Sequence, residues 1–177
     1  KTGKIQLRDE ILDSFAWTGD EKVLDVGCGR GLMLIGAAKK LRKGKATGID
    51  VWDPNGLSGN KPEAALENAK AEGVSERVKI ENGDAMRLSY PAGSYDVVLS
   101  SSVLHSIPDA PEREQALSEM YRVTKPGGRI AIFDVYHAGD YATYLQGLGL
   151  QEVKVSGLKW LWGVPGRIIQ GVKPATA

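Results

Sequence analysis

Residues 23–31 read VLDVGCGRG, an apolar strand that runs into three glycines spaced two residues apart, and this stretch constrains the fold more than any other. A chain that leaves a buried strand and enters a helix turns sharply, and Gly27, Gly29 and Gly31 can adopt the positive φ that such a turn requires. Glycines also admit a ligand against bare backbone, where the free amides of the next helix face it. The stretch therefore predicts a strand, a ligand-binding turn and a helix in succession.

Asp25, two residues before the first glycine, narrows the class of ligand. A dinucleotide site places pyrophosphate at this turn, and its glycines are spaced two and then three residues apart. Here both spacings are two residues, and a carboxylate at the end of the strand repels a pyrophosphate a few Å away. The turn therefore favours a ligand that carries cationic groups and no phosphate.

A second acid follows at the end of the next apolar strand, in the sequence GIDVW at residues 48–52. Asp50 lies about 20 residues past the glycines, where an acid accepts hydrogen bonds from ribose hydroxyls. Val51 and Trp52 come next and are apolar enough to flank an adenine. Together with Asp25, this second acid predicts an adenosine that carries a positively charged tail.

Helical and strand patterns alternate along the chain without internal repeats. Four short runs are too uniformly apolar for a sheet with one wet face, namely residues 23–26, 46–51, 97–99 and 130–133. Strands buried on both faces indicate a parallel sheet with helices on either side, which is a three-layer α/β sandwich. The last two strands, at residues 152–155 and 167–172, are separated by about ten residues without a helical pattern. We therefore expect them to pair as a hairpin, so that the last strand is antiparallel.

The length of 177 residues suits one core with about 70% of the unfolded surface buried. We expect a single domain over residues 1–177 that opens with a helix within residues 1–17. A net charge of +1 gives no electrostatic case for binding nucleic acid. The chain has no long apolar run and no secretory signal, and its one cysteine cannot form an internal disulfide, which together favour the cytoplasm. It begins with Lys1 rather than methionine, so a fragment of a longer chain is a second interpretation.

Four stretches in this order resemble the motifs of the class I S-adenosylmethionine-dependent methyltransferases, and the resemblance runs over nearly the whole chain. VLDVGCGRG is similar to their first motif, and GIDVW to their second. NGDAMRLSYPAGSYDVVLSSSVLH, residues 82–105, is similar to the third and fourth, and RVTKPGGRI, residues 122–130, to the turn before the fifth strand. The resemblance implies a Rossmann-like sheet of seven strands, mostly parallel with an antiparallel last strand, and S-adenosylmethionine as the cofactor.

The resemblance also assigns roles to individual residues. The methionine end of the cofactor would be held by Asp25 and by the turn residues Gly27, Cys28, Gly29 and Gly31. Asp50 would bind the ribose hydroxyls, with Val51 and Trp52 beside the adenine, and Asp84, between Gly83 and Ala85, would bind the adenine amino group. Ser100 and Ser101 would line the cofactor at the end of the fourth strand. The three acids also have a structural interpretation as helix caps or solvated loop residues. Cys28 is expected to act as a small residue, because no base accompanies it.

Methyl transfer from a sulfonium is an in-line displacement, so the protein chiefly positions the acceptor and excludes water. A base is needed only where the acceptor loses a proton. His105 and Asp134, at the ends of two strands, are the candidates retained from a set that also includes Tyr136 and His137. Each has a structural alternative, since similar methyltransferases often carry a histidine at the position of His105 whatever their substrate, and Asp134 is also placed to cap the next segment. The catalytic residues stay open, and no metal site is expected.

Three further features bear on the acceptor. SSSV after the fourth strand differs from the Asn/Asp-Pro-Pro-aromatic sequence of relatives that methylate amino groups of bases and glutamines, so that class is disfavoured. The loop DPNGLSGN, residues 53–60, is rich in turn residues and is a candidate to close over the adenine. In LKWLWGVP, residues 158–165, buried packing is the default interpretation of Trp160 and Trp162. The alternative is an apolar rim that contacts a hydrophobic acceptor, a missing N-terminal segment or a membrane surface.

We therefore expect a methyltransferase that acts on a small-molecule acceptor, because little chain is left to build a domain that recognises macromolecules. Two alternatives stay open. A NAD-linked oxidoreductase would keep the fold, although Asp25 and the glycine spacing argue against it. A module that binds S-adenosylmethionine without catalysis would also fit, because no catalytic base is assigned. Neither the oligomeric state nor the atom that is methylated follows from the sequence.

Overall fold

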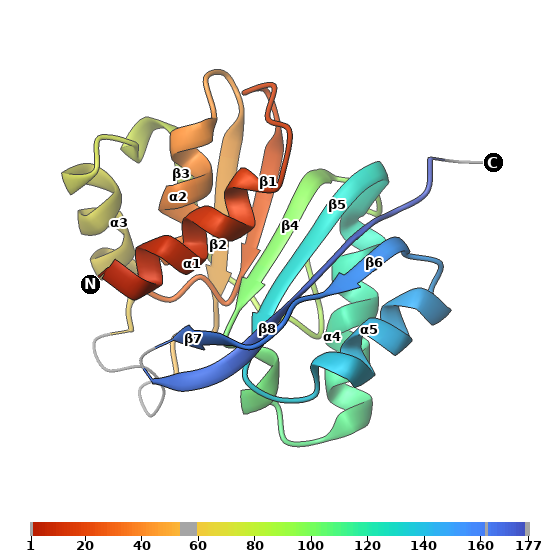
Figure 1. Cartoon of the computed structure of the whole chain (residues 1–177). Coiled ribbons are helices and arrows are strands. Elements are labelled where there is room, and N and C mark those ends of the chain that lie inside the picture. The colour runs from red at the N-terminus through yellow and green to blue at the C-terminus, as the bar shows by residue number, and fades with distance from the viewer. Residues whose placement is uncertain (1, 54–59, 162, 176–177) are drawn as a thin grey trace.

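The computed structural model describes residues 2–53, 60–161 and 163–175, and helices alternate with strands along most of that length (Figure 1). The elements are α1 (Thr2–Asp13), β1 (Lys22–Val26), α2 (Leu32–Lys40), β2 (Lys45–Asp50), α3 (Pro62–Ala71), β3 (Val78–Asn82), β4 (Tyr95–Ser101), α4 (Ala110–Val123), β5 (Thr124–Asp134), α5 (Ala138–Gly147), β6 (Gln151–Val155), β7 (Lys159–Leu161) and β8 (Val164–Val172). Two short 3-10 helices, Ser75–Arg77 and Leu104–Ser106, precede β3 and follow β4.

The strands form one mixed sheet in the order β3-β2-β1-β4-β5-β8-β6, with β7 paired to β8 off this path. β1 to β5 are parallel to one another, whereas β8 runs antiparallel to both β5 and β6. The predicted parallel sheet with an antiparallel last strand is confirmed, and so is the pairing of β6 with β8. Within the described residues, the short β7 is an addition to the seven strands that were expected.

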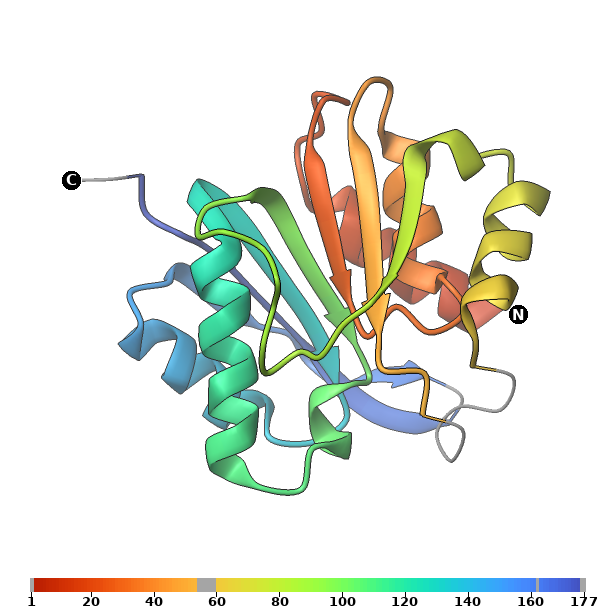
Figure 2. The same cartoon turned by 180° about the vertical axis from the view of Figure 1, so that it is seen from behind.

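Helices cover both faces of the sheet. α1, α2 and α3 lie on one face, and α4 and α5 lie on the other, as the two opposite views show (Figure 1 and Figure 2). α2 is buried from Met33 to Ala38, because it lies between the sheet and α1. At Gly36 a Cβ atom would lie 2.7 Å from Leu12 Cδ1 on α1, so a bare backbone permits this close crossing. The predicted three-layer sandwich is confirmed.

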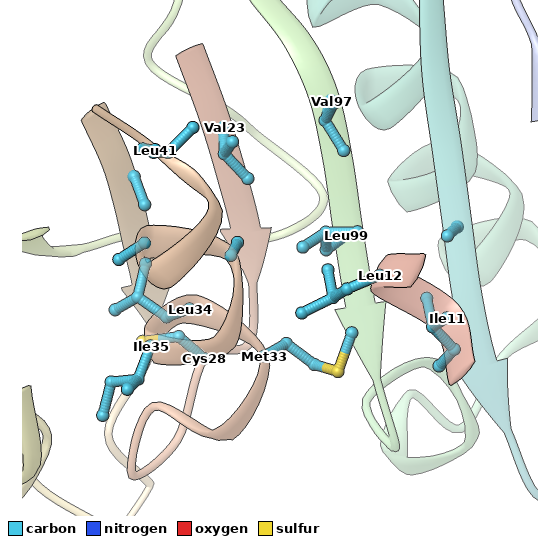
Figure 3. Packing of buried hydrophobic residues seen from close by; sticks show 14 of the residues in the cluster. Ile11, Leu12, Val23, Cys28, Met33, Leu34, Ile35, Leu41, Val97 and Leu99 are labelled. Carbon is cyan, nitrogen blue, oxygen red and sulfur yellow. The ribbon is translucent and has the colours of Figure 1, made fainter. Parts of the chain in front are cut away.

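Two hydrophobic clusters fill the space between the layers. In the first, Leu12 of α1 and Met33 of α2 pack with the side chains of β1 and β4 (Figure 3). The second lies on the opposite face and contains Leu117 of α4. Neighbouring residues of β1 divide between the clusters, since Val23 belongs to the first and Leu24 to the second. This division explains why the middle strands are apolar at every position.

The start of β5 and the helix α3 also differ from the sequence-based expectation. β5 begins at Thr124 rather than near Ile130, because Thr124 already pairs with Tyr95 and the register then shifts across an irregularity. α3 was not anticipated, because the residues that it buries are the small alanines Ala64, Ala65 and Ala69, which give a weak apolar pattern. Within the described ranges, every helix is too short or too polar to traverse a lipid bilayer.

Candidate functional site

The parallel strands end together at one edge of the sheet, and the residues singled out in the sequence follow those ends. Asp50, Ser101 and Asp134 are the last residues of β2, β4 and β5. Figure 1 shows the hairpin of β7 and β8 at the same edge. Ligands of open α/β sheets bind at such an edge, beside the point where the strand order reverses, which is here between β1 and β4.

The glycine turn after β1 has the backbone that the sequence predicts. The angle φ is 72° at Gly27, 50° at Gly29 and 90° at Gly31, which places all three in the left-handed region. A Cβ atom at Gly27 would lie 2.2 Å from Val103 Cγ2, just beyond the end of β4. A side chain at Gly27 would therefore push the ends of β1 and β4 apart. The prediction of a positive φ is confirmed at each glycine.

Asp25 is buried, with 1% of its surface exposed. Its Oδ2 atom accepts a hydrogen bond of 2.9 Å from Leu34 N in the first turn of α2. The N-cap residue of α2 is Gly31, which has no side chain, so Asp25 supplies the acceptor that a helix start normally takes from its N-cap. Burial, with a smaller contribution from the charge of Asp50, raises the pKa of Asp25 from 3.8 to about 7. The structure thus realises the helix-cap interpretation of this acid.

Asp50 ties the glycine turn to the end of β2. Its Oδ2 atom accepts a hydrogen bond from Gly29 N at 2.9 Å. Its Oδ1 atom accepts from Trp52 N at 2.9 Å and from Asn60 Nδ2 at 3.2 Å. Trp52 has a φ of 55°, a conformation that is uncommon for a bulky residue, and Val51 before it is exposed. Three donors from the chain itself therefore fix the orientation of the Asp50 carboxylate.

The polar residues after β3 and β4 differ in how far their side chains are engaged. Asp84 is exposed, and its Oδ1 atom accepts a hydrogen bond from Met86 N at 2.9 Å. Ser100 is buried, and its hydroxyl donates to Val26 O at 3.0 Å, which joins β4 to β1. Ser101 is half-buried at the end of β4. The Ser100 hydroxyl therefore serves the sheet, while Asp84 keeps a carboxylate oxygen at the surface.

Three buried polar atoms at this edge, Trp52 Nε1, Asn60 Oδ1 and Ser102 Oγ, have no hydrogen-bond partner in the part of the chain that the structure describes. An unpaired buried polar atom costs roughly 1–3 kcal/mol, so such atoms mark places where a bound molecule completes the bonding. Ser102 also has a φ of 59°. One donor, one acceptor and a hydroxyl, beside a bare glycine backbone, fit the polar groups of S-adenosylmethionine. The sequence analysis missed Ser102, because nothing in a run of three serines distinguishes it.

Cys28 is buried inside the glycine turn. Burial raises the pKa of its thiol, and the charges of Asp25 and Asp50 raise it further. A Cβ atom at Gly48 would lie 2.8 Å from Cys28 Sγ, so the sulfur packs directly on the backbone of β2. A thiol that stays protonated and enclosed is a poor nucleophile. The burial of Cys28 agrees with the expectation of a small packing residue.

The two candidate catalytic residues form a single pair. His105 Nδ1 lies 2.6 Å from Asp134 Oδ1, and His105 N donates to Asp134 Oδ2 at 3.2 Å. Asp134 is buried, and Val135 N also donates to it at 2.7 Å. The bond to Asp134 raises the pKa of the half-buried His105. Because Nδ1 is engaged by the carboxylate, Nε2 is the ring nitrogen left for proton exchange with a ligand.

A cavity of about 210 Å³ lies beside this pair, between the end of β5, the start of α5 and the hairpin of β7 and β8. Asp134, Tyr136, Leu158 and Arg167 are among the residues that line it. The rings of His105 and Tyr136 meet edge to face with their centroids 6.3 Å apart. The cavity therefore adjoins both members of the pair, through Asp134 directly and through Tyr136 to His105.

Trp160 lies on the hairpin and is 62% exposed, so the default expectation of buried packing is wrong for it. The reason is that β7 pairs with β8 alone, outside the main path of the sheet. Lys159, beside Trp160, forms an ion pair with Glu10 of α1. Side chains alternate along a strand, so α1 covers the side of β7 that Lys159 takes and leaves Trp160 on the other side.

Two expectations fall outside the described residues. One concerns Trp162. The other concerns the loop expected to close over the adenine, of which residues 54–59 lie outside the described ranges. Its last residue, Asn60, is described and contacts Asp50.

The comparisons with known proteins agree with this geometry. A sequence model of the methyltransferase domain family matches residues 23–128, more than half of the chain. Methyltransferase GfsG of Streptomyces halstedii is 35% identical over 135 residues, which are 76% of this chain and 45% of that protein. The 27-O-demethylrifamycin SV methyltransferase of Amycolatopsis mediterranei is 34% identical over 129 residues, which are 73% of this chain and 44% of that protein.

The fold has solved counterparts as well. The crystal structure of a SAM-dependent methyltransferase from Aquifex aeolicus superposes with a TM-score of 0.73 at 21% identity, over 97% of this chain and 93% of that chain. By contrast, this chain spans less than half the length of the two sequence relatives, 45% and 44%. The family match covers residues 23–128, which include the glycine turn and the ends of β1 to β4.

Proposed function

The chain belongs to the class I S-adenosylmethionine-dependent methyltransferases, and on this premise we propose that it methylates a hydroxyl oxygen of a small organic acceptor. The observation that carries the proposal is the hydrogen bond of 2.6 Å between His105 Nδ1 and the buried Asp134. A hydroxyl must lose a proton to become a strong nucleophile, whereas a neutral amine already presents a lone pair. A histidine held by a carboxylate at the acceptor end of the site therefore favours oxygen over nitrogen.

S-adenosylmethionine supplies an activated methyl group on a sulfonium, and the residues of this chain bind and orient it. In this proposal the methionine end contacts the backbone of Gly27, Cys28, Gly29 and Gly31. Asp50 accepts hydrogen bonds from the ribose hydroxyls, Val51 and Trp52 flank the adenine, and Asp84 with Gly83 and Ala85 binds the adenine amino group. Ser100, Ser101 and Ser102 border the cofactor where β4 ends. Asp25 acts from beneath the turn, since its carboxylate holds the start of α2.

His105 acts as the base in this proposal. Asp134 accepts a hydrogen bond from the Nδ1–H group and so leaves Nε2 to take the proton of the acceptor hydroxyl. The buried carboxylate also stabilises the imidazolium that forms. His105 works only in its neutral form, so the rate rises as the pH rises through its pKa, which Asp134 holds above the ordinary value.

A small-molecule acceptor is supported by the name of one relative, a 27-O-demethylrifamycin SV methyltransferase. The family match gives no support to the NAD-linked alternative, and the same is true of a module without catalysis. Among the methyltransferases, the combination of a glycine turn, a held Asp50 and a paired histidine is what a donor site joined to an oxygen-acceptor site requires.

Transfer of labelled methyl groups to a panel of phenols, alcohols, amines and thiols tests this function. We expect transfer to hydroxyls, and we expect His105→Gln to lower its rate by about 100-fold or more, the usual contribution of a positioned base. Calorimetry should give the same affinity for S-adenosylmethionine in both proteins, because His105 lies on the acceptor side. Transfer to amines at a rate that His105→Gln does not change would contradict the proposal.

A further inference from the structure

Three large apolar side chains lie exposed at or near the cavity. Tyr136 follows β5 and Leu158 directly precedes β7, and both line the cavity, whereas Trp160 lies on β7 two residues after Leu158. Their exposed fractions lie between 56% and 63%. Large apolar groups gathered on the surface of a protein mark a place where something binds. We call these three residues the hairpin surface.

The hairpin turns Trp160 away from α1. The ion pair between Lys159 and Glu10 sets the side of β7 that faces α1. Side chains alternate along a strand, so Trp160 takes the opposite side. Leu158, which directly precedes β7, lines the cavity together with Gly166 and Arg167 of β8.

The hairpin surface is also continuous with the candidate base. Tyr136 lines the cavity together with Leu158, and its ring meets the ring of His105. A path therefore leads from His105 over Tyr136 and across the cavity to Leu158, and Trp160 follows two residues further along the chain. Whatever binds along this path reaches the atom that takes up the proton.

The size of the cavity decides how much of a ligand it encloses. Its volume is about 210 Å³, whereas pockets that enclose a drug-sized molecule have about 300–1,000 Å³. A larger molecule whose hydroxyl reaches His105 must therefore continue over the hairpin surface, where Trp160 and Tyr136 offer flat aromatic faces.

From this continuity we infer that the hairpin surface binds the apolar body of the acceptor, so that the substrates are hydrophobic alcohols or phenols larger than a single ring. The inference rests on the proposed function. Lys159 is balanced by Glu10, so of the hairpin's cations this one offers little to an anionic lipid surface. The path to His105 accounts for the exposed side chains without a membrane.

Binding of phenol and of 2-naphthol, measured by calorimetry in the presence of S-adenosylhomocysteine, tests the inference. The second ring of naphthol adds apolar area, so we expect the wild-type protein to bind it at least about tenfold more tightly than phenol. The double variant Leu158→Ser, Trp160→Ser should reduce this ratio to about threefold or less. Leu66→Ser is the matched control, because Leu66 is 46% exposed on α3 and should keep the wild-type ratio.

A second variant and three further outcomes sharpen the test. Trp160→Phe keeps an aromatic face and should keep most of the preference for naphthol. A double variant with an unchanged ratio overturns the inference. If the double variant keeps the ratio but no longer binds phosphatidylglycerol vesicles, the surface belongs to a membrane contact. If it keeps the ratio but no longer forms a dimer in light scattering, the surface belongs to a second copy of the chain. Either result overturns the inference. If the ratio falls as expected but no hydroxyl is methylated, the proposed function fails while the binding inference stands.

Discussion

The edge of the sheet that carries the site is built in two different ways. On the cofactor side, at the ends of β1 and β2, Asp25 and Asp50 accept hydrogen bonds from backbone amides of the turns and helix around them. On the acceptor side, at the ends of β4 and β5, the central contact joins two side chains, His105 and Asp134, in addition to two backbone amides that donate to Asp134, and the distant strand β8 supplies part of the cavity wall.

The cofactor and the acceptor are therefore positioned by different kinds of contact. Backbone amides have fixed positions once the turn has formed, so the cofactor side is rigid and tolerates little change. On the acceptor side, the cavity-lining side chains of Tyr136 and Leu158 are exposed, so they can be exchanged without disturbing the strands. Such a division lets a family keep one methyl donor while the residues that bind the acceptor vary.

The change expected to have the largest effect breaks the acceptor side alone. Asp134→Asn keeps the shape of the side chain but removes the charge that stabilises protonated His105. We expect the rate to fall about 100-fold or more, with an unchanged affinity for the cofactor. The inflection of the pH–rate profile should also move to lower pH, because the pKa of His105 is no longer raised. An inflection that stays in place would show that Asp134 does not position the base.

The next largest effect breaks the cofactor side. Gly27 and Gly73 have similar φ, 72° and 70°, but a Cβ atom meets Val103 at 2.2 Å in the first and nothing within 4 Å in the second. Substitution by alanine should cost each about 1 kcal/mol through the backbone, and Gly27→Ala about 1–3 kcal/mol more through the clash. Urea denaturation measures this difference. Calorimetry should show at least a tenfold loss of cofactor affinity in Gly27→Ala alone, and equal results for the two variants would remove the steric argument.

A smaller effect concerns the charge of Asp25 on the cofactor side and appears in the pH dependence of stability. The pKa of Asp25 is raised to about 7 in the folded protein, so between pH 4 and 7 the folded state binds more protons than the unfolded state and stability falls as the pH rises. From pH 5 to pH 8 this loss should amount to about 2–3 kcal/mol, at about 1.4 kcal/mol for each pKa unit. The Asp25→Asn variant should not show this loss of stability. Urea denaturation of both proteins at the two pH values measures the difference, and parallel curves would contradict the raised pKa.

The two sides also differ in how far the sequence predicts them. The glycine turn and the acids Asp25 and Asp50 lie in short stretches whose spacing sets their geometry, so strand, turn and ligand class follow from local patterns. Even there, the sequence left open whether Asp25 caps a helix, because that depends on which amide the carboxylate meets.

The acceptor side depends on contacts between distant segments. His105 and Asp134 were separate candidates in the sequence, and only the parallel pairing of β4 with β5 brings them together. Trp160 was expected to be buried, since apolarity alone does not reveal that β7 leaves the main sheet. Ser102 was missed because its positive φ and unpaired hydroxyl are properties of the folded chain.

The place of β8 sets an order of events during synthesis. β8 is the last strand among the described residues, yet it lies between β5 and β6. The strands β1 to β4 are complete once residue 101 has been made, whereas β5 keeps an open edge until residues 164–172 emerge. An unpaired edge invites pairing with other chains. On the ribosome, the half that grips the methyl donor can therefore assemble first, and the half that meets the acceptor is the one exposed to misassembly.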